Sequence, residues 1–393
     1  MADILIVLIR FAALLLYYVS YLMPRNKRLW VFGEANGFNN NSKYLYLEII
    51  RSYPDIRALW IGPKEVVEEL RQKGLPAENR KSIKGIVYCL FAKCYFVSST
   101  PGDVNFYTSG GAVVINLWHG VGWKACLWNN PIHKKYEKAN FINKMVHLVM
   151  NPHLYYKPDY VLSTSPTMTE CFFAPMFKVK NNQCIEDIYP RCKFMLQEES
   201  LIINHINKYE NHDHLQLIHK MRSYNRIIIY APTFRDTGSD FLVDSGIDFD
   251  DLNSFCIEHN YLFIIKCHPA TIFSKAKIDG YSNILHLNNR FDLYLLMPFS
   301  DVLISDYSSI ALDYLLLHKK VVFYPFDLEK YNNSCRDFVI DYMDSIKEAI
   351  VVTDYKSLKL AIEQDNFPIN PSLINRFWCG RESLIEVIKE YVL

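Results

Sequence analysis

The hydrophobic positions after residue 28 form short runs of Val, Ile, Leu, Tyr and Trp, separated by longer segments of mixed character. This alternation is typical of the strand–helix units of an α/β fold. The runs are continuous rather than strictly alternating, which indicates parallel strands buried on both faces. The predicted strands are Leu29–Phe32, Ile56–Ile61, Tyr95–Ser98, Val113–Trp118, Tyr160–Ser163, Ile227–Tyr230, Leu262–Lys266, Val302–Ser305 and Val321–Tyr324.

A polar stretch rich in His and Asn, at 204–224, separates the first five of these strands from the last four. We place a domain boundary there, which predicts one domain over 26–205 and a second over 206–393. The chain length of 393 residues fits two domains, because a domain averages roughly 150 residues.

The first 25 residues form a hydrophobic segment in which only Arg10 and Ser20 are clearly polar between Ile4 and Met23. About 20 apolar residues are enough for a helix that crosses a bilayer. The same pattern fits a helix that lies on the membrane surface. The sequence alone leaves both alternatives open, and both predict that the working surface of the protein lies next to a membrane.

The residues that follow this segment bear on its processing and on the side of the membrane. The stretch Tyr21–Arg25 offers no small-residue cleavage site, so we expect the segment to be retained. A basic cluster of Arg25, Lys27 and Arg28 follows the hydrophobic segment. By the positive-inside tendency this cluster predicts that the rest of the chain lies at the cytoplasmic face of the cell membrane.

Composition excludes several classes of protein. Half of the residues are hydrophobic and 22% are charged, which excludes a chain that is disordered as a whole. The net charge of +1 shows no excess of basic residues of the kind that binds nucleic acid. The 10 cysteines include no Cys-x-x-Cys pair, which favours a reducing compartment without a zinc or redox site. No acidic cluster has metal-ligand spacing, so we expect that no metal is obligatory.

Polar or titratable groups follow four of the predicted strands. Ligands of open α/β sheets bind outside the carboxyl ends of the strands, so these residues predict one shared site. Each group taken alone also has a structural explanation, as a helix cap, a surface ion pair or a buried histidine. The four groups are His119-Gly120, Pro232-Thr233-Phe234-Arg235-Asp236, His268-Pro269 and Asp306-Tyr307-Ser308-Ser309.

Ser308 and Ser309 should open a helix that runs through Leu315. The start of a helix presents free N–H groups to an anion, so this position suits a phosphate. Asp313 lies four residues after Ser309, which places both on one helix face, where the carboxylate could reach a ribose or an alcohol. The chain has no G-x-x-x-x-G-K-[ST] loop and no complete dinucleotide fingerprint, which argues against a classical NTPase or dehydrogenase.

Five ordered motifs resemble the CDP-glycerol:glycerophosphate glycerophosphotransferase family of wall teichoic acid and capsule synthesis. The resemblance covers roughly Leu29 to the C-terminus and includes Asn41-Ser42-Lys43-Tyr44-Leu45. The motifs are Trp118-His119-Gly120 with Lys124, Ala231-Pro232-Thr233-Phe234-Arg235, His268-Pro269, Ser305-Asp306-Tyr307-Ser308-Ser309 with Asp313, and Tyr324-Pro325-x-Asp327-x-x-x-Tyr331.

The resemblance implies a GT-B-like fold, in which two Rossmann-like domains face each other across a cleft. The C-terminal domain would hold the CDP moiety and the N-terminal domain would face the acceptor. Two stretches depart from the family pattern. Val121-Gly122 stands where Thr-Pro is frequent, and Ile188–Lys193 replaces a common Gly-x-Pro-Arg-x-Asp stretch. Both lie in the predicted N-terminal domain.

The reaction that the resemblance implies is attack of an acceptor hydroxyl on the β-phosphorus of a CDP-alditol, with release of CMP. The acceptor would be a lipid-linked or polymeric teichoic-acid-like or capsular chain. Our hypothesis makes His119 the base, because the pKa of an imidazole is about 6.5. His268 and Arg235 would stabilise the phosphates or the departing CMP. The remaining substrate-binding candidates are Lys124, Thr233, Lys266, Asp306, Ser308, Ser309 and Asp313.

Two further readings of the sequence remain. One keeps the GT-B-like fold but takes CDP-ribitol or a nucleotide sugar as donor, since nothing in Ser308, Ser309 and Asp313 distinguishes glycerol from ribitol. The other is a non-catalytic membrane scaffold for polymer synthesis. The number of units added, the acceptor and the oligomeric state are left open.

Overall fold

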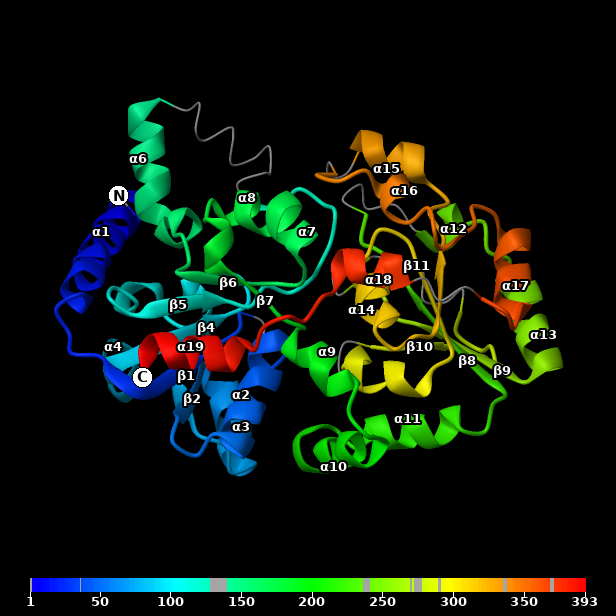
Figure 1. The fold of residues 1–393 in the computed structure, drawn as a ribbon, viewed down its shortest axis with the longest axis horizontal. Coiled ribbons are helices and arrows are strands. Elements are labelled where there is room, and N and C mark those ends of the chain that lie inside the picture. Colours follow the sequence, from blue (N-terminus) through cyan, green and yellow to red (C-terminus); the bar gives the residue numbers. More distant parts are fainter. Residues whose placement is uncertain are drawn as a thin grey trace. The chain divides into compact units, whose positions relative to one another are not determined.

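The computed structural model describes residues 2–35, 37–127, 140–235, 241–268, 271, 278–288, 291–334, 338–367 and 371–393. These residues form two compact units, each of which contains one parallel sheet with helices (Figure 1). The first unit comprises Met1–His119, Ala125–Arg191 and Trp378–Leu393. The second comprises Gly120–Lys124 and Cys192–Phe377.

The first unit has a seven-stranded sheet in the order β3-β2-β1-β4-β5-β6-β7. All described pairs are parallel. The apolar runs of β1, β2, β4 and β5 are buried, as continuous apolar runs predict, whereas the polar residues that begin β1 are exposed. The strands are β1 (Asn26–Phe32), β2 (Arg57–Gly62), β3 (Ala77–Asn79), β4 (Ala92–Val97), β5 (Val113–Asn116), β6 (Tyr160–Ser163) and β7 (Cys184–Glu186).

Helices connect and cover the strands of this sheet. The longest is α1 (Ala2–Ser20), which contacts α6 (Phe141–Met150). No helix in the part of the chain that the structure describes is both long enough and apolar enough to cross a membrane. The other helices are α2 (Asn40–Ser52), α3 (Lys64–Gln72), α4 (Ile83–Phe91), α7 (Pro166–Met168), α8 (Ala174–Phe177) and α19 (Leu384–Val392).

The second unit has a six-stranded parallel sheet in the order β10-β9-β8-β11-β12-β13. Its strands are β8 (Arg226–Ala231), β9 (Tyr261–Ile265), β10 (Ile284–His286), β11 (Val302–Ser305), β12 (Lys320–Phe323) and β13 (Ile350–Val351). Its helices are α10 (Glu199–Tyr209), α11 (Asp213–Met221), α12 (Phe241–Asp244), α13 (Phe249–His259), α14 (Ile310–Leu315), α15 (Leu328–Ser334), α16 (Tyr342–Ser345), α17 (Tyr355–Glu363) and α18 (Pro371–Phe377). Helix α9 (Pro190–Met195) contains the point where the chain passes from the first unit to the second.

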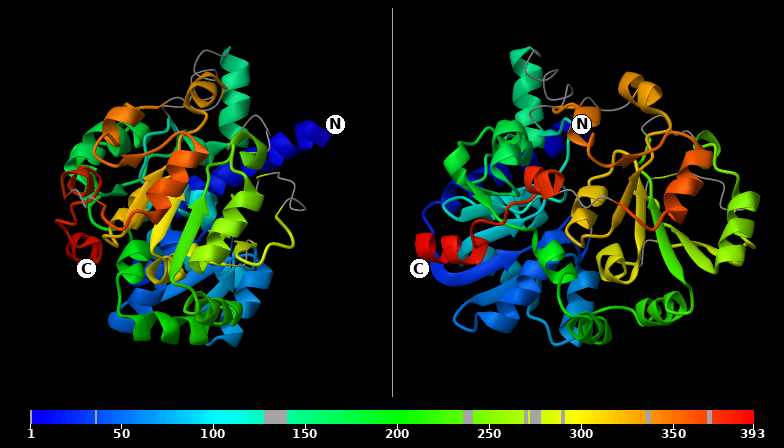
Figure 2. Two further views of the ribbon diagram at one scale, coloured as in Figure 1. Left: turned by 90° about the vertical axis from the view of Figure 1, so that its right-hand side faces the viewer. Right: turned by 45° about the vertical axis from the view of Figure 1, so that its right-hand side comes forward.

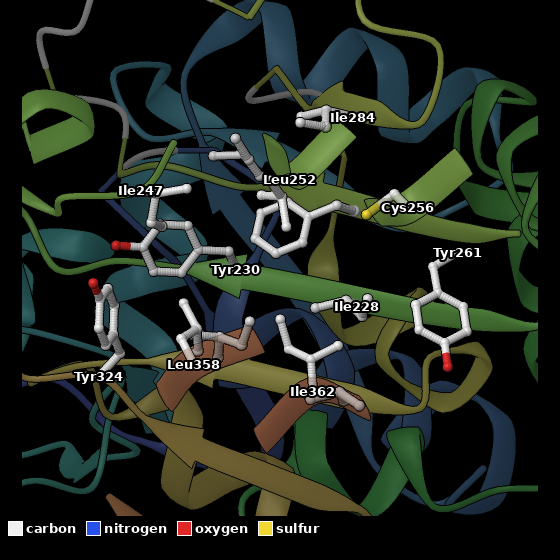
Figure 3. Packing of buried hydrophobic residues seen from close by; sticks show 14 of the residues in the cluster. Ile228, Tyr230, Ile247, Leu252, Cys256, Tyr261, Ile284, Tyr324, Leu358 and Ile362 are labelled. Carbon is white, nitrogen blue, oxygen red and sulfur yellow. The ribbon is translucent and has the colours of Figure 1, made fainter. Parts of the chain in front are cut away.

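The core of the second unit lies between this sheet and the pair α13 and α17. Figure 2 shows these two helices on one face of the sheet and α14 on the other. Leu252 and Cys256 of α13 and Leu358 of α17 pack with Ile228 and Tyr230 of β8 (Figure 3). All five side chains are at most 1% exposed, so the sheet is rigidly supported where it carries the site.

The division into units differs from the predicted boundary between 205 and 206. The polar stretch at 204–224 overlaps α10 and α11, and the chain passes between the units near Arg191. The C-terminal residues return to the first unit, where the Leu384 N–H donates to Asp187 Oδ2 at 2.9 Å and α19 contacts β7. This return pairs segments nearly 200 residues apart, which local sequence patterns do not reveal.

Candidate active site

The carboxylate of Asp306 lies at the centre of the site in the second unit. Asp306 follows β11 and is fully buried. Its Oδ1 accepts hydrogen bonds from the backbone N–H groups of Thr233, at 2.8 Å, and Tyr307, at 2.6 Å. Its Oδ2 accepts from Arg235 Nη2 at 2.8 Å. Burial would raise the pKa of Asp306, but the Arg235 guanidinium and the hydrogen bonds hold that pKa below its usual value.

Arg235 is the buried cation of this site, with 4% of its side chain exposed. Its Nε and Nη2 donate to the two carboxylate oxygens of Asp327, at 2.8 and 2.9 Å, in a bidentate pair. Its Nη1 donates to the Thr233 carbonyl at 2.6 Å. Burial would lower the pKa of Arg235, but the two carboxylates raise it. Arg235 therefore fixes the loop after β8 to Asp306 and Asp327.

Aromatic rings surround this guanidinium. The ring centroids of Tyr307, Phe326 and Tyr331 lie 5.2 to 5.3 Å from the Arg235 Cζ atom, within cation–π range. The Tyr307 hydroxyl also donates to Asp327 Oδ1 at 3.0 Å. The structural alternative, a surface ion pair between Arg235 and Asp236, is not tested, because Asp236 lies outside the described residues. Direct contact of Arg235 with a substrate phosphate stays a prediction.

Ser308 and Ser309 precede α14, as predicted, and both are partly exposed. Asp313 lies one turn into the helix, and its N–H donates to the Ser309 carbonyl at 3.2 Å. Unlike the serines, Asp313 is fully buried, and its Oδ2 accepts a hydrogen bond from the Tyr294 hydroxyl. The serine hydroxyls are therefore more accessible to a ligand than this carboxylate is.

The segment 120–124 belongs to the second unit and contacts the same residues. Gly120 faces the Ser309 side chain. Lys124 forms an antiparallel bridge with Phe338, and its Nζ lies 5.6 Å from the ring centroid of Tyr331. This places Lys124 beside one of the rings that surround Arg235.

Lys266 and His268 follow β9, the neighbour of β8 in the sheet. The Lys266 Nζ donates to the Asn288 carbonyl at 3.0 Å, and burial lowers the pKa of this lysine. His268 is exposed, and its ring centroid lies 5.7 Å from that of Phe234. His268 and the Thr233–Arg235 loop therefore lie at the same edge of the sheet. Pro269 lies outside the described residues.

His119, the predicted base, lies in the first unit just beyond β5 and is exposed. Its Nδ1 lies 2.9 Å from the Ser98 carbonyl oxygen. A carbonyl accepts only, so Nδ1 carries the proton of the neutral ring and the lone pair is on Nε2. This tautomer is the one that can accept a proton at Nε2.

The backbone around His119 is held by buried polar side chains. Arg191 Nη1 donates to the His119 carbonyl at 3.0 Å, and Asn41 Nδ2 donates to the Trp118 carbonyl at 2.9 Å. Asn41 belongs to a motif of the resemblance, whereas Arg191 was noticed only as part of a departure from the family pattern. The structure gives both a role in fixing the histidine loop.

Two buried carboxylates near this loop were not predicted from the sequence. Asp103 Oδ2 accepts hydrogen bonds from the N–H groups of Ser98, at 3.0 Å, and Ser99, at 2.8 Å. Burial and the nearby Glu34 raise the pKa of Asp103 to about 7. Burial also raises the pKa of Glu34. No motif marks these residues, and only the thorough burial of both side chains singles them out.

A family model described as CDP-Glycerol:Poly(glycerophosphate) glycerophosphotransferase matches residues 15–369, a range that includes all of these motifs. The chain belongs to this glycerophosphotransferase family. The predicted resemblance is thereby confirmed. Membership rests on more than half of the chain and on both units.

Curated members of the glycerophosphotransferase family resemble the chain at moderate identity. A teichoic acid poly(glycerol phosphate) polymerase of Staphylococcus epidermidis is 26% identical over 340 residues, which are 82% of this chain and 43% of that protein. A teichoic acid glycerol-phosphate transferase of Staphylococcus aureus is 25% identical over 339 residues, 83% of this chain and 81% of that protein. The chain thus spans less than half the length of the first of these relatives.

Solved structures show the same fold. A structure of the Wall Teichoic Acid Polymerase TagF has a TM-score of 0.70 and 20% identity, and the match covers 100% of this chain and 96% of that one. A UDP-GlcNAc 2-epimerase from Neisseria meningitidis has a TM-score of 0.54 and 12% identity, covering 92% and 99% of the chains. The α/β class with parallel sheets is confirmed. A cleft between two facing domains stays a prediction.

Proposed function

We propose that this protein transfers glycerol phosphate from CDP-glycerol to a hydroxyl of a lipid-linked teichoic-acid-like or capsular polymer and releases CMP. The observation that carries the proposal is the joining of three family motifs in one buried network, through Thr233, Arg235, Asp306 and Asp327. Charged groups are costly to desolvate, and this network repays that cost by bonds among its own members, which hold the loops after β8, β11 and β12 in a fixed arrangement where the family motifs meet.

The acceptor hydroxyl oxygen attacks the β-phosphorus of CDP-glycerol in this reaction. A new P–O bond forms, the P–O bond to CMP breaks, and the hydroxyl proton passes to His119. The Nδ1–Ser98 hydrogen bond supports this role, because it leaves the lone pair on Nε2. His268 stabilises the charge that develops on the phosphates or on the departing CMP.

The donor-binding role falls to the second unit. The partly exposed hydroxyls of Ser308 and Ser309 bind the diphosphate, and Asp313 anchors the nucleotide or its glycerol through its bond with Tyr294. Lys124 and Lys266 add positive charge. Arg235 and Asp306 hold Thr233 in place rather than extending into solvent. The proposal requires no metal ion.

CDP-ribitol is the second candidate donor. A teichoic acid ribitol-phosphate primase of Bacillus spizizenii is 29% identical to this chain over 258 residues, 65% of this chain and 61% of that protein. This identity is as high as that to the glycerol-phosphate enzymes. The shared motifs therefore do not distinguish CDP-glycerol from CDP-ribitol, and the choice of donor rests on side chains outside them.

We also propose that the protein works at the cytoplasmic face of the cell membrane, bound to its surface. Helix α1 exposes Phe11, at 57%, and Tyr18, at 66%, and the adjoining α6 exposes Phe141, at 77%. Arg10 and Lys144 are exposed on the same two helices. Apolar side chains with neighbouring cations suit the interface of an anionic bilayer.

The deciding experiment incubates the protein with CDP-glycerol or CDP-ribitol and a membrane acceptor. CMP release is measured, and the product length is read by mass spectrometry. CMP release and a product heavier by glycerol phosphate units are expected with CDP-glycerol. Turnover with CDP-ribitol alone would transfer the proposal to the second donor. Binding of neither nucleotide by isothermal titration would favour the non-catalytic scaffold.

A further inference from the structure

The segment 120–124 is held against the second unit along its whole length. Val121 and Trp123 are fully buried, and the Trp123 carbonyl accepts from the Val339 N–H at 2.6 Å. The Trp123 ring contacts the ring of Tyr342 at a centroid distance of 5.1 Å. These contacts leave the segment little freedom to move away from α14.

Gly120 has no space for a side chain at its contact with Ser309. A Cβ atom built on Gly120 would lie 2.5 Å from Ser309 Oγ and 3.1 Å from Ser309 Cβ. Among the described residues other than its two chain neighbours, it would meet nothing else within 4 Å. Non-bonded carbon and oxygen atoms do not approach so closely, so a methyl group here would displace the serine. Gly120 is not among the glycines with positive φ, so its backbone conformation is open to alanine.

We propose that Gly120 is a positioning residue for the donor site. Because Gly120 has no side chain, the Ser309 hydroxyl can occupy the position in which it binds the donor. The inference rests on the proposed function, in which Ser309 binds the diphosphate of CDP-glycerol. A misplacement of about 1 Å can reduce the efficiency of a site about 100-fold. The required shift of Ser309 is of this order, because the overlap must open from 2.5 Å to ordinary contact.

Gly122 supplies a matched control two residues away on the same segment. A Cβ atom on Gly122 would lie 4.0 Å from Ser309 Cβ, which is ordinary contact, and its φ is not positive either. Gly120→Ala and Gly122→Ala therefore add the same methyl group to the same segment, and only the first overlaps Ser309. Thermal unfolding without donor establishes that each variant is folded.

The test measures the Kd for CDP-glycerol by isothermal titration, and KM and kcat by CMP release. Gly120→Ala is expected to raise Kd and KM about tenfold or more, whereas Gly122→Ala stays within about twofold of the wild type. In a Ser309→Gly background, where the overlapping atoms are absent, adding Gly120→Ala should change Kd by less than about twofold. This pair of variants keeps the test available if Gly120→Ala does not fold.

Each other result decides between the proposals. Three results would overturn the positioning role but leave the assignment of CDP-glycerol as donor unchanged. They are a Kd for Gly120→Ala within twofold of the wild type, an equal loss of affinity in Gly122→Ala, and a tenfold effect of Gly120→Ala in the Ser309→Gly background. Failure of the wild-type protein to bind CDP-glycerol would overturn the proposed function, and the positioning role with it.

Discussion

Replacement of Arg235 by methionine removes the only described cation that bonds to Asp306 and Asp327. Methionine fills similar space but donates no hydrogen bond, so both carboxylates and the Thr233 carbonyl lose their bonds to the guanidinium. Asp306 is fully buried and the Asp327 side chain is 9% exposed, so water cannot replace the lost donors without rearrangement. The variant leaves two buried negative charges close together.

The magnitude follows from this burial. Removal of one partner from a buried ion pair costs about 3–5 kcal/mol. For a domain of this size, each kcal/mol lowers Tm by about 2–4 °C. The unfolding of the second unit should therefore shift down by about 6–20 °C at pH 7.

The pH dependence has a definite sign. In the wild type, burial would raise the pKa of Asp306, but Arg235 holds it below the usual value. The stability that this carboxylate contributes is therefore present above its unfolded pKa of about 3.9 and is lost as the pH falls through the lower native pKa. Without Arg235, burial raises this pKa instead. Because the folded variant then takes up a proton more readily, its deficit should shrink between pH 7 and pH 5.

The assay is thermal and urea unfolding followed by circular dichroism at pH 7 and pH 5. Arg222→Met is the matched control, because Arg222 is 47% exposed and pairs with the 59% exposed Glu199. Such a surface pair contributes about 0–1 kcal/mol. A deficit for Arg235→Met below about 1 kcal/mol, or one that is equal at both pH values, would refute this account of the network.

Four other predictions concern catalysis, pH, metal and membrane. His119→Ala and His268→Ala should each lower CMP release about 10²–10⁴-fold, whereas the exposed His212→Ala should stay near the wild type; a two- or threefold loss at both sites is too small for the mechanism. Because burial raises the pKa of Asp103 to about 7, the free energy of unfolding of the wild type should decrease as the pH rises from about 4 to 7. In urea unfolding, Asp103→Asn should flatten this slope, and an unchanged slope would contradict the assignment. EDTA should leave initial rates within about twofold, and a loss restored by Mg²⁺ would show that a metal is needed. Phe141→Glu should decrease the fraction of protein that sediments with phosphatidylglycerol vesicles. An undiminished fraction would show that α6 is not part of the membrane-binding surface.

The sequence predicted the longer strands and missed the short ones. All nine predicted strands coincide with strands of the structure, because runs of four or more apolar residues are buried on both faces of a parallel sheet. The four that were missed, β3, β7, β10 and β13, have two or three residues each. So short a segment carries no periodicity that sets it apart from a loop.

The residues of the site were predictable as groups that follow strands, but not as members of one sheet edge or as partners. Arg235 and Asp306 follow β8 and β11 of the six-stranded sheet, whereas His119 follows β5 of the seven-stranded sheet of the first unit. They were found because ligand-binding residues of open α/β sheets lie beyond the carboxyl ends of the strands. The bidentate partner of Arg235 is Asp327, 92 residues away. Pairings over such separations depend on the strand order, which the local sequence does not state.

The sequence by itself determined the class of fold, the order of the motifs and the family, since these follow from local hydrophobic runs and from residue types at fixed spacing. Tertiary structure alone decided the burial of Asp313, the return of α19 to the first unit and the raised pKa of Asp103. These properties depend on how much water each group loses and on which charges come near it in space. Both quantities arise only when distant parts of the chain pack together.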